Sequence, residues 1–251
     1  RHIFTAIKDI KPSHVAICWD MGQATFRNAM YTSYKQNRPA PSEKLIPQFD
    51  YVKDISEQFG FVNIGVANYE ADDVIGTLAK IYSKDNEVHI VTGDRDILQC
   101  INEQVEVWLI RKGFNIYHHY TLNRFNEEYA LHPLQLIDIK AFMGDSADGY
   151  PGVKGIGEKT AIKLIQSYGS VENVLDHIES LTPGQQKKIA TDKENLILSK
   201  QLAEIYTDVP IDTTALYKEM EYTHSLNHIL SICNEHELYV SGKYLASKIL
   251  M

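Results

Sequence analysis

Acidic side chains recur in this sequence where an apolar run ends. Asp20 ends the apolar run of residues 15–19, and Asp94 follows the run of residues 88–93. Both runs are typical of buried parallel strands, and open α/β sheets bind ligands at the edge where such strands stop. We therefore expect the carboxylates of Asp20 and Asp94 at the ligand-binding edge of a sheet.

Further carboxylates follow along the chain. They are Glu70, Asp72, Asp73, Asp96, Asp145 and Asp148. The first three begin a pattern with apolar residues at near-helical spacing, which predicts a helix whose acidic first turn faces the positive end of the helix dipole. Taken singly, an acidic first turn or a turn aspartate has a structural interpretation, which capping and turn preferences favour by about two to one.

As a set, these carboxylates predict a metal site. Carboxylates that converge on one edge of a sheet repel one another unless hard cations neutralise them, and oxygen ligands alone select Mg²⁺ or Mn²⁺ over zinc. The sequence has no Cys–His spacing typical of a zinc site. We therefore expect Mg²⁺ or Mn²⁺ at one shared site.

The elements that would position these residues alternate at first between strands and helices. Strands are predicted for residues 14–20, 61–66, 87–92 and 105–110, and helices for residues 43–59 and 70–84. Such alternation is typical of an α/β fold with a mostly parallel central sheet flanked by helices. Gly113 predicts an edge hairpin that joins residues 105–110 to residues 115–120.

Only helices are predicted after Thr121. Their ranges are 121–129, 133–143, 157–168, 182–189 and 194–205, with a final pair beyond Ser225. We therefore expect an α/β core over residues 1–120 and a helical region over residues 121–251.

Length and composition allow one substantial core, with or without a small helical annex. The chain has 251 residues, of which 44% are apolar, and its three cysteines lie far apart, as in a reduced cytoplasmic protein. No signal peptide or membrane-length apolar run is visible, so we expect a soluble protein. The formal net charge of −8 argues against a protein that coats DNA without regard to sequence, because phosphate binding normally needs a clustered basic surface.

A glycine-rich turn follows Asp148 and leads into a predicted helix. Such a turn offers backbone N–H groups to a phosphate, and the helix start adds its dipole. Alone it is as often structural as functional, but the two lysines and the acidic pair upstream favour phosphate binding, although the spacing is not that of a Walker loop. The candidate phosphate ligands are Gly152, Lys154, Gly155, Gly157, Lys159 and Thr160.

Cations and aromatic rings are interleaved between Phe26 and Arg38. The candidate residues there are Arg27, Tyr34, Lys35 and Arg38. This mixture suits single-stranded nucleic acid, because rings stack on bases and cations hold phosphates. The alternative is a solvated amphipathic helix or loop, which the stretch alone would favour.

Together these motifs resemble those of the 5′ nuclease family, which comprises the 5′→3′ exonuclease domain of bacterial DNA polymerase I, phage 5′ nucleases and flap endonucleases. They are most similar to those of stand-alone bacterial 5′→3′ exonucleases, and their order and spacing extend over most of the chain. The motifs are Phe26-Arg27, Tyr34-Lys35-x-x-Arg38, Glu70-Ala-Asp-Asp, Thr92-Gly-Asp-Arg-Asp, Met143-Gly-Asp-Ser-Ala-Asp and Gly152-Val-Lys-Gly-Ile-Gly-Glu-Lys-Thr-Ala.

The resemblance implies a PIN-like nuclease core, a C-terminal helix-three-turn-helix element and hydrolysis of phosphodiesters with two metal ions roughly 4 Å apart. By resemblance, the first metal is held by Asp20, Glu70, Asp72, Asp73 and Asp94, and the second by Asp96, Asp145 and Asp148. Lys35 and Arg38 match the base of a helical arch that reaches the scissile phosphate, and Asp73 and Asp94 join them as catalytic residues. The glycine turn would hold duplex phosphates and a K⁺ ion through backbone carbonyls.

The resemblance also implies a monomer that acts in replication and repair on DNA flaps, nicks and junctions, with RNA primers as a further substrate. Two rivals remain. One is a catalytically silent protein of the same fold that binds DNA junctions, and the other is a small-molecule phosphohydrolase with a similar acidic site.

The sequence departs from the family pattern in two places. Gly149-Tyr150 replaces the usual Asn-Ile after Asp148, and no apolar strand ending in Asp-Gly precedes Arg1. The chain would then start inside the family's first long helix, and it is either a fragment or a natural truncation that would lack a central strand and one metal ligand. We favour a fragment, because losing a central strand exposes the edges of its neighbours.

Overall fold

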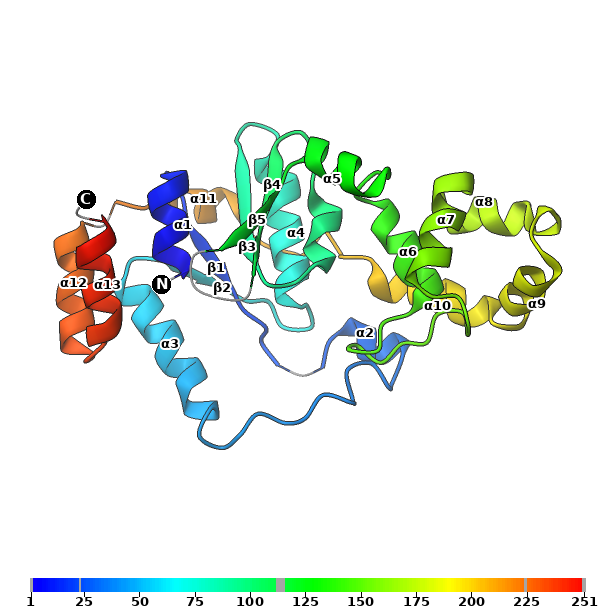
Figure 1. Ribbon diagram of the computed structural model, residues 1–251. Coiled ribbons are helices and arrows are strands. Elements are labelled where there is room, and N and C mark those ends of the chain that lie inside the picture. The colour runs from blue at the N-terminus through cyan, green and yellow to red at the C-terminus, as the bar shows by residue number, and fades with distance from the viewer. Residues whose placement is uncertain (1, 23, 112–115, 224, 250–251) are drawn as a thin grey trace.

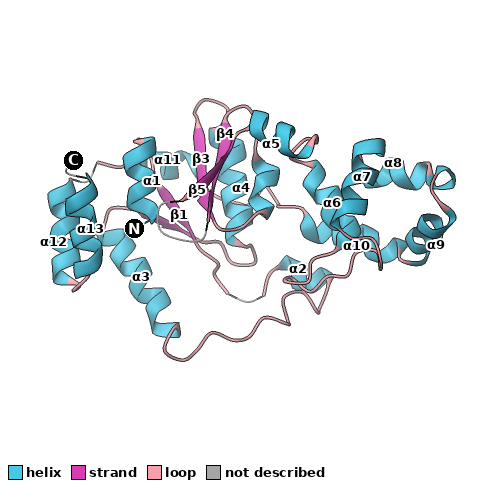
Figure 2. Cartoon of the chain, viewed as in Figure 1, coloured by secondary structure: helices cyan, strands magenta, loops and turns pink. Residues whose placement is uncertain are grey.

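The computed structural model describes residues 2–22, 24–111, 116–223 and 225–249. The molecule is elongated, with strands in its middle and helices at both ends (Figure 1; Figure 2). Its elements are α1 (His2–Ile10), β1 (Ala16–Cys18), α2 (Phe26–Met30), α3 (Ile46–Gln58), β2 (Val62–Ile64), α4 (Ala71–Tyr82), β3 (Val88–Thr92), the 3₁₀ helix η1 (Asp96–Cys100), β4 (Val105–Ile110), β5 (Tyr117–Tyr120), α5 (Leu122–Tyr129), α6 (Gln135–Met143), α7 (Glu158–Tyr168), α8 (Val171–Asp176), the 3₁₀ helix η2 (Ile178–Ser180), α9 (Pro183–Thr191), α10 (Lys193–Ala203), α11 (Thr213–Glu219), α12 (Leu226–Glu235) and α13 (Tyr239–Ile249).

The described strands form two short sheets, where the sequence predicted one central sheet. β1 and β2 are parallel, with Ala16 opposite Val62. β3 and β4 are also parallel, and β5 pairs antiparallel to β4. The parallel pairs and the edge hairpin are therefore confirmed, while Gly113 itself lies outside the described residues.

A cavity of about 580 Å³ lies between the two sheets. It is lined by β1 and β3 and covered by residues of α1 and α4. Among the described strands, β1 pairs only with β2, and β3 pairs only with β4. Each of these strands therefore has one edge without a partner strand among the described residues, and the cavity separates the two sheets.

Local sequence signals account for most helix boundaries. α5 begins after Thr121, whose Oγ accepts the N–H of Arg124 at 3.2 Å. α7 begins after Gly157 and ends at Gly169, whose φ of 87° lies in the left-handed region that glycine adopts without strain. The sequence analysis missed the short helices α2, α8 and α11. Within the described ranges, no helix has the length and apolar character needed to cross a bilayer.

The hydrophobic cores show how the halves of the chain are joined. The largest core connects Ile90 and Val107 of the mixed sheet to Phe142 of α6 and Ile165 of α7. In a second core, Ile229, Ile232 and Leu245 of the final helices pack with Phe4 of α1 and Phe61. The last helices therefore return to the α/β part, and residues 121–251 do not pack as one separate helical unit.

Candidate active site

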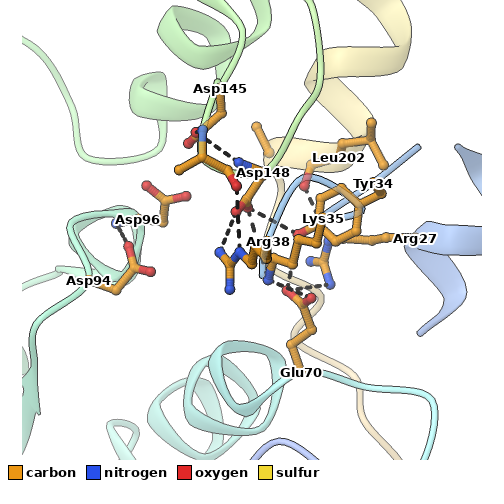
Figure 3. A network of polar contacts seen from close by, with 12 residues as sticks. Arg27, Tyr34, Lys35, Arg38, Glu70, Asp94, Asp96, Asp145, Asp148 and Leu202 are labelled. Carbon is orange, nitrogen blue, oxygen red and sulfur yellow. Dashed lines mark hydrogen bonds and ion pairs between the residues drawn. The ribbon is translucent and has the colours of Figure 1, made fainter. Parts of the chain in front are cut away.

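Carboxylates from separate segments face one small pocket. The pocket has a volume of about 20 Å³, and its lining includes Glu70, Asp72, Asp94, Asp96 and Asp148. Glu70 caps the start of α4, Asp94 and Asp96 follow β3, and Asp148 lies in the turn after α6 (Figure 3). The structure thus gathers residues that are far apart in the sequence, as the predicted sheet edge required.

Asp96, Asp145 and Asp148 form the tightest group. One ligand oxygen from each lies within 4.8 Å of the others. The turn after α6 orients two of them, because Asp145 Oδ1 accepts the N–H of Ala147 at 2.8 Å and the N–H of Asp148 at 3.2 Å. All donors are carboxylate oxygens, so the group fits a hard divalent cation such as Mg²⁺ or Mn²⁺.

The carboxylates of the site divide into two halves by their contacts. Lys35 Nζ lies 2.6 Å from Glu70 Oε1, and Arg38 NH2 lies 2.5 Å from Asp148 Oδ1. Lys140 Nζ lies 2.6 Å from Asp145 Oδ2 and also contacts Asp96. The carboxylates in contact with a lysine or arginine are the paired half of the site, namely Glu70, Asp96, Asp145 and Asp148.

Asp20, Asp72 and Asp94 are the unpaired half. In the described part of the chain, none of them forms an ion pair with a lysine, arginine or histidine. Asp20 Oδ1 accepts the N–H of Ala71 at the start of α4, at 2.8 Å. Burial raises the pKa of Asp72 to about 7, and the nearby charges of Asp94 and Glu70 contribute to that rise.

Arg27 and Asp73 lie inside the protein, which corrects two predictions. Arg27 is 2% exposed and Asp73 is 0% exposed, and two hydrogen bonds of 2.8 Å join the guanidinium to the carboxylate. Arg27 also donates to the carbonyl of Glu204 at 2.7 Å, and Asp73 accepts the N–H of Tyr206 at 2.9 Å. A buried charge needs such a partner. Arg27 is therefore not a DNA contact, and Asp73 is not free to bind a metal or act in catalysis.

Tyr34 is also buried, which corrects its assignment to stacking on DNA bases. It is 3% exposed, and its hydroxyl lies 3.2 Å from Glu70 Oε2 and 3.2 Å from Asp148 Oδ2. Burial, together with the charges of Glu70 and Asp148, raises the pKa of Tyr34 well above its usual range. The phenol therefore stays protonated and holds Glu70 of the α/β part beside Asp148 of the helical region.

Lys35 and Arg38 follow Tyr34 and reach the acidic pocket from one side (Figure 3). The backbone N–H of Lys35 donates to the carbonyl of Asp148 at 2.7 Å. Lys35 is half-buried, whereas the side chain of Arg38 is 52% exposed. The structure therefore places both predicted arch residues directly at the carboxylates.

In the glycine turn, some of the backbone N–H groups already have hydrogen-bond partners within the protein. The N–H of Gly152 is buried and donates to Ser199 Oγ at 3.1 Å, and the N–H of Lys154 donates to Asp192 Oδ2 at 2.9 Å. These two N–H groups are thus unavailable, which corrects the assignment of Gly152. Gly155, with a φ of 80°, and Gly157 are exposed. The side chains of Lys154 and Lys159 are exposed as well, whereas Thr160 is half-buried.

Lys140 is the residue of the site that the sequence analysis missed. It lies in the last turn of α6, five positions before Asp145. Its carboxylate partner Asp96 belongs to η1. A lysine one helical turn before an acidic motif is the only sequence signal for this contact, and it does not indicate Asp96.

Comparison with known proteins identifies the family of this chain. The model for the 5′-3′ exonuclease, N-terminal resolvase-like domain matches residues 1–130, and the model for the 5′-3′ exonuclease, C-terminal SAM fold matches residues 131–225. A 5′-3′ exonuclease of Bacillus subtilis is 45% identical over 238 residues, which cover 95% of this chain and 80% of that protein. DNA polymerase I of Lactococcus lactis is 42% identical over 81% of this chain, which spans only 24% of that longer protein.

Solved structures share the fold. T5 5′-exonuclease with bound divalent metal ions (zinc) has a TM-score of 0.70 and 24% identity, over 82% of this chain and 79% of that one. The catalytic core of Rad2 in complex with a DNA substrate has a TM-score of 0.58 and 15% identity, over 92% of this chain and 77% of that one. The family models and the identity to the Bacillus enzyme show that the chain belongs to the 5′→3′ exonuclease family.

Proposed function

We propose that this protein is a metal-dependent 5′ nuclease that hydrolyses phosphodiesters of DNA near junctions between single and double strands. The observation that carries this proposal is the group of Asp96, Asp145 and Asp148, within 4.8 Å of one another, beside the cations of Lys35 and Arg38. Carboxylates suit divalent metals, and adjacent cations suit a phosphate. Membership of the exonuclease family supports action from the 5′ end.

We assign two Mg²⁺ or Mn²⁺ ions to the two ends of the pocket. Asp96, Asp145 and Asp148 would hold one ion. Glu70 would hold the other together with the unpaired half, Asp20, Asp72 and Asp94. When bound, such ions supply an activated water and stabilise the leaving oxygen. The chain itself would supply Lys35 and Arg38 as ligands of the scissile phosphate, since both already reach the pocket.

DNA is the proposed partner, and two surfaces would contact it. Lys35 and Arg38 would contact the strand that is cut, while Gly155, Gly157, Lys154, Lys159 and Thr160 would contact duplex phosphates. The start of α7 supports the second assignment, because the first N–H groups of a helix have no partner within the helix. The likeness to T5 D15 flap endonuclease, solved in a pseudo-enzyme-product complex with DNA and metal ions, supports a flap as the substrate.

Further details are proposed on the family resemblance. K⁺ at the glycine turn would bind backbone carbonyls. The carbonyl of Gly155 already accepts a hydrogen bond from the cationic Nζ of Lys188 at 2.9 Å, so K⁺ would have to share or replace this contact. RNA primers are a proposed second substrate, and the proposed working state is a monomer in the cytoplasm, acting in replication and repair.

Cleavage of a labelled 5′ flap tests the proposed reaction. The double variant Asp145→Asn, Asp148→Asn is expected to lose Mg²⁺-dependent cleavage and to keep its flap affinity in Ca²⁺ within about tenfold, or about 1.4 kcal/mol. Full activity of this variant would contradict the metal assignment. A wild-type protein that binds the flap without cutting it would instead be a silent junction-binding protein.

The duplex surface is tested separately with Gly155→Val. A Cβ at Gly155 would lie 3.0 Å from Lys188 Nζ, and its φ of 80° is strained for valine. We expect a larger loss of affinity for duplex-bearing substrates than for single strands. Gly184→Val is the matched control, because a Cβ at Gly184 meets no atom within 4 Å. Equal losses on both kinds of substrate would exclude the turn as a duplex contact.

A further inference from the structure

Lys140 spans two aspartates that belong to different parts of the fold. Its Nζ lies 2.5 Å from Asp96 Oδ2 and 2.6 Å from Asp145 Oδ2. Asp96 comes from η1 after β3, whereas Asp145 follows α6. The side chains of these three residues are each 17–20% exposed, so the ammonium group lies largely out of solvent between the carboxylates.

The contacts of Lys140 use much of the ligand capacity of these carboxylates. Both oxygens of Asp96 face the ammonium group. Asp145 gives Oδ2 to Lys140, while its Oδ1 already accepts two backbone N–H groups. An ammonium group has three donors and no acceptor, so it takes lone pairs that a metal ion also needs. Asp96 and Asp145 are two of the three aspartates that fit a divalent cation.

We propose that Lys140 is a built-in counter-ion that competes with a divalent cation for Asp96 and Asp145 and so sets the metal affinity of this end of the pocket. A divalent ion that enters has to share or displace the lysine, and the fixed positive charge opposes its approach. This inference rests on the proposed metal site and concerns the residue that regulates its occupancy. Lys140 thereby sets the metal affinity of the site, a role distinct from that of Lys35 and Arg38, which would contact DNA.

Competition is separable from a structural role, because the two roles predict opposite effects on metal binding. If Lys140 only held the ligands together, its removal would loosen the site and weaken metal binding. If Lys140 competes, its removal strengthens metal binding, although the metal-free protein becomes less stable because Asp96 and Asp145 then face each other without a cation. Binding of Mn²⁺ to the complete chain is therefore the decisive measurement, and it does not depend on cleavage.

The variant Lys140→Met keeps the length of the side chain and removes its charge. We expect it to bind Mn²⁺ about tenfold more tightly than the wild type in calorimetric titration or by electron paramagnetic resonance of free Mn²⁺. In EDTA its Tm is expected to fall, and added Mn²⁺ is expected to raise that Tm by more than it raises the Tm of the wild type. Lys140→Arg keeps the charge and is expected to retain the wild-type response. Lys140→Gln also removes the charge and is the second test variant if the methionine variant folds poorly.

Lys200→Met is the matched control. Lys200 Nζ also bridges two carboxylates, Asp138 at 2.7 Å and Glu172 at 2.7 Å, and its side chain is 26% exposed. Lys200→Met changes the net charge by the same amount as Lys140→Met, but Lys200 lies outside the pocket. The Mn²⁺ affinity of Lys200→Met is therefore expected to stay at the wild-type value.

The outcomes separate this inference from the proposed function. Equal or weaker Mn²⁺ binding by Lys140→Met would overturn the inference and leave the metal site standing. Tighter binding by both Lys140→Met and Lys200→Met would also overturn it, because the effect would then come from net charge alone. A wild-type protein that binds no Mn²⁺, or one whose binding is unchanged by Asp145→Asn and Asp148→Asn, would contradict the proposed metal site itself.

Discussion

The two halves of the acidic site differ in how the protein compensates their charge. In the paired half, Glu70, Asp96, Asp145 and Asp148 each contact a lysine or arginine of this chain. In the unpaired half, Asp20, Asp72 and Asp94 form no such contact within the described residues, and the pKa of Asp72 rises to about 7. The charge of the paired half is thus compensated by side chains of this chain, whereas that of the unpaired half is not compensated by any ion pair among the described residues.

The position of each half explains this difference. The paired half lies at the junction between the α/β part and the helical region, where Lys35, Arg38 and Lys140 contact its carboxylates. The unpaired half lies at the ends of β1 and β3 and on the first turn of α4, near the open edges of the two sheets. Four experiments test whether the two halves really behave differently.

Replacing Arg27, the buried ion-pair partner of Asp73, is expected to have the largest effect on stability. Arg27→Met leaves Asp73 buried without its partner, and breaking a buried ion pair in this way costs about 3–5 kcal/mol. Chemical denaturation measures the free energy of unfolding. Arg38→Met is the matched control for stability, because its exposed ion pair contributes roughly 0–1 kcal/mol. A similarly small loss of unfolding free energy in both variants would mean that the buried ion pair of Arg27 contributes no more than the exposed ion pair of Arg38.

Lys35→Ala tests whether a cation of the paired half also serves catalysis. A cation that neutralises charge developing at the scissile phosphate contributes more in the transition state than in the bound complex. We expect single-turnover cleavage to fall about 100-fold and flap affinity to fall by a much smaller factor. If rate and affinity fell together, Lys35 would be a simple phosphate anchor.

The pH dependence of stability in EDTA is expected to have opposite signs at Asp72 and at Asp145, whereas Asp96 of the paired half is expected to behave like Asp72 because burial raises its pKa. The pKa of Asp72 is raised from 3.8 to about 7, so the stability linked to its protonation is present below pH 3.8 and is lost as the pH rises through about 7. Between pH 5 and pH 7 this loss is about 2 kcal/mol. For Asp145, burial acts to raise the pKa, but hydrogen bonds from Lys140 and the backbone lower it overall, so stability is lost at acid pH, as the pH falls through that lowered pKa.

Asp72→Asn is expected to remove the loss of stability between pH 5 and pH 7. Asp145→Asn is expected to leave this loss of stability in place. Saturating Mn²⁺ is expected to reduce the loss in the wild type, because a bound cation favours the ionised carboxylate. Thermal unfolding at a series of pH values measures both effects. An unchanged slope in Asp72→Asn would show that the unpaired half needs no external cation.

An added strand is expected to have the smallest effect. An N-terminal extension that carries an apolar strand ending in Asp can pair with the open edges of β1 and β3 and bring a carboxylate between Asp20 and Asp94. After the cost of ordering the strand, we expect a gain of about 1–2 kcal/mol in stability and tighter Mg²⁺ binding. A control extension with alternating Ser and Gly is expected to give neither. If both forms melt and cut alike, the gap between the sheets does not accept a strand.

The sequence was sufficient for the strands and the longer helices because their signals are local, whereas several short helices were missed. Apolar runs marked the strands, and Thr121 and Gly157 marked the starts of helices. The sequence was insufficient to predict the division into two sheets. That division depends on which strands lie side by side, and β1 and β3 are separated by a cavity instead of being paired. The return of the last helices to Phe4 and Phe61 is likewise a long-range packing choice that no local pattern contains.

The site shows the same limit at the level of single residues. The Glu70-Ala-Asp-Asp motif marked α4, but neighbouring positions on a helix point in different directions. Asp73 consequently meets Arg27 inside the protein, while Asp72 faces the pocket. Tyr34 was expected to stack on bases because its ring is aromatic, but its hydroxyl joins Glu70 to Asp148, which only the folded chain brings together.

Arg27 also determines when the site forms. Its guanidinium donates to the carbonyls of Leu202 and Glu204, which lie 175 and 177 positions further along the chain. Contacts between such distant residues form slowly, because a long loop has to close first, and a chain under synthesis folds from its N-terminus. A nascent chain that ends before Leu202 already carries every carboxylate of the site, but its Arg27 lacks these two carbonyl acceptors. The site is therefore expected to reach its final arrangement only after residues 202–204 have been synthesised.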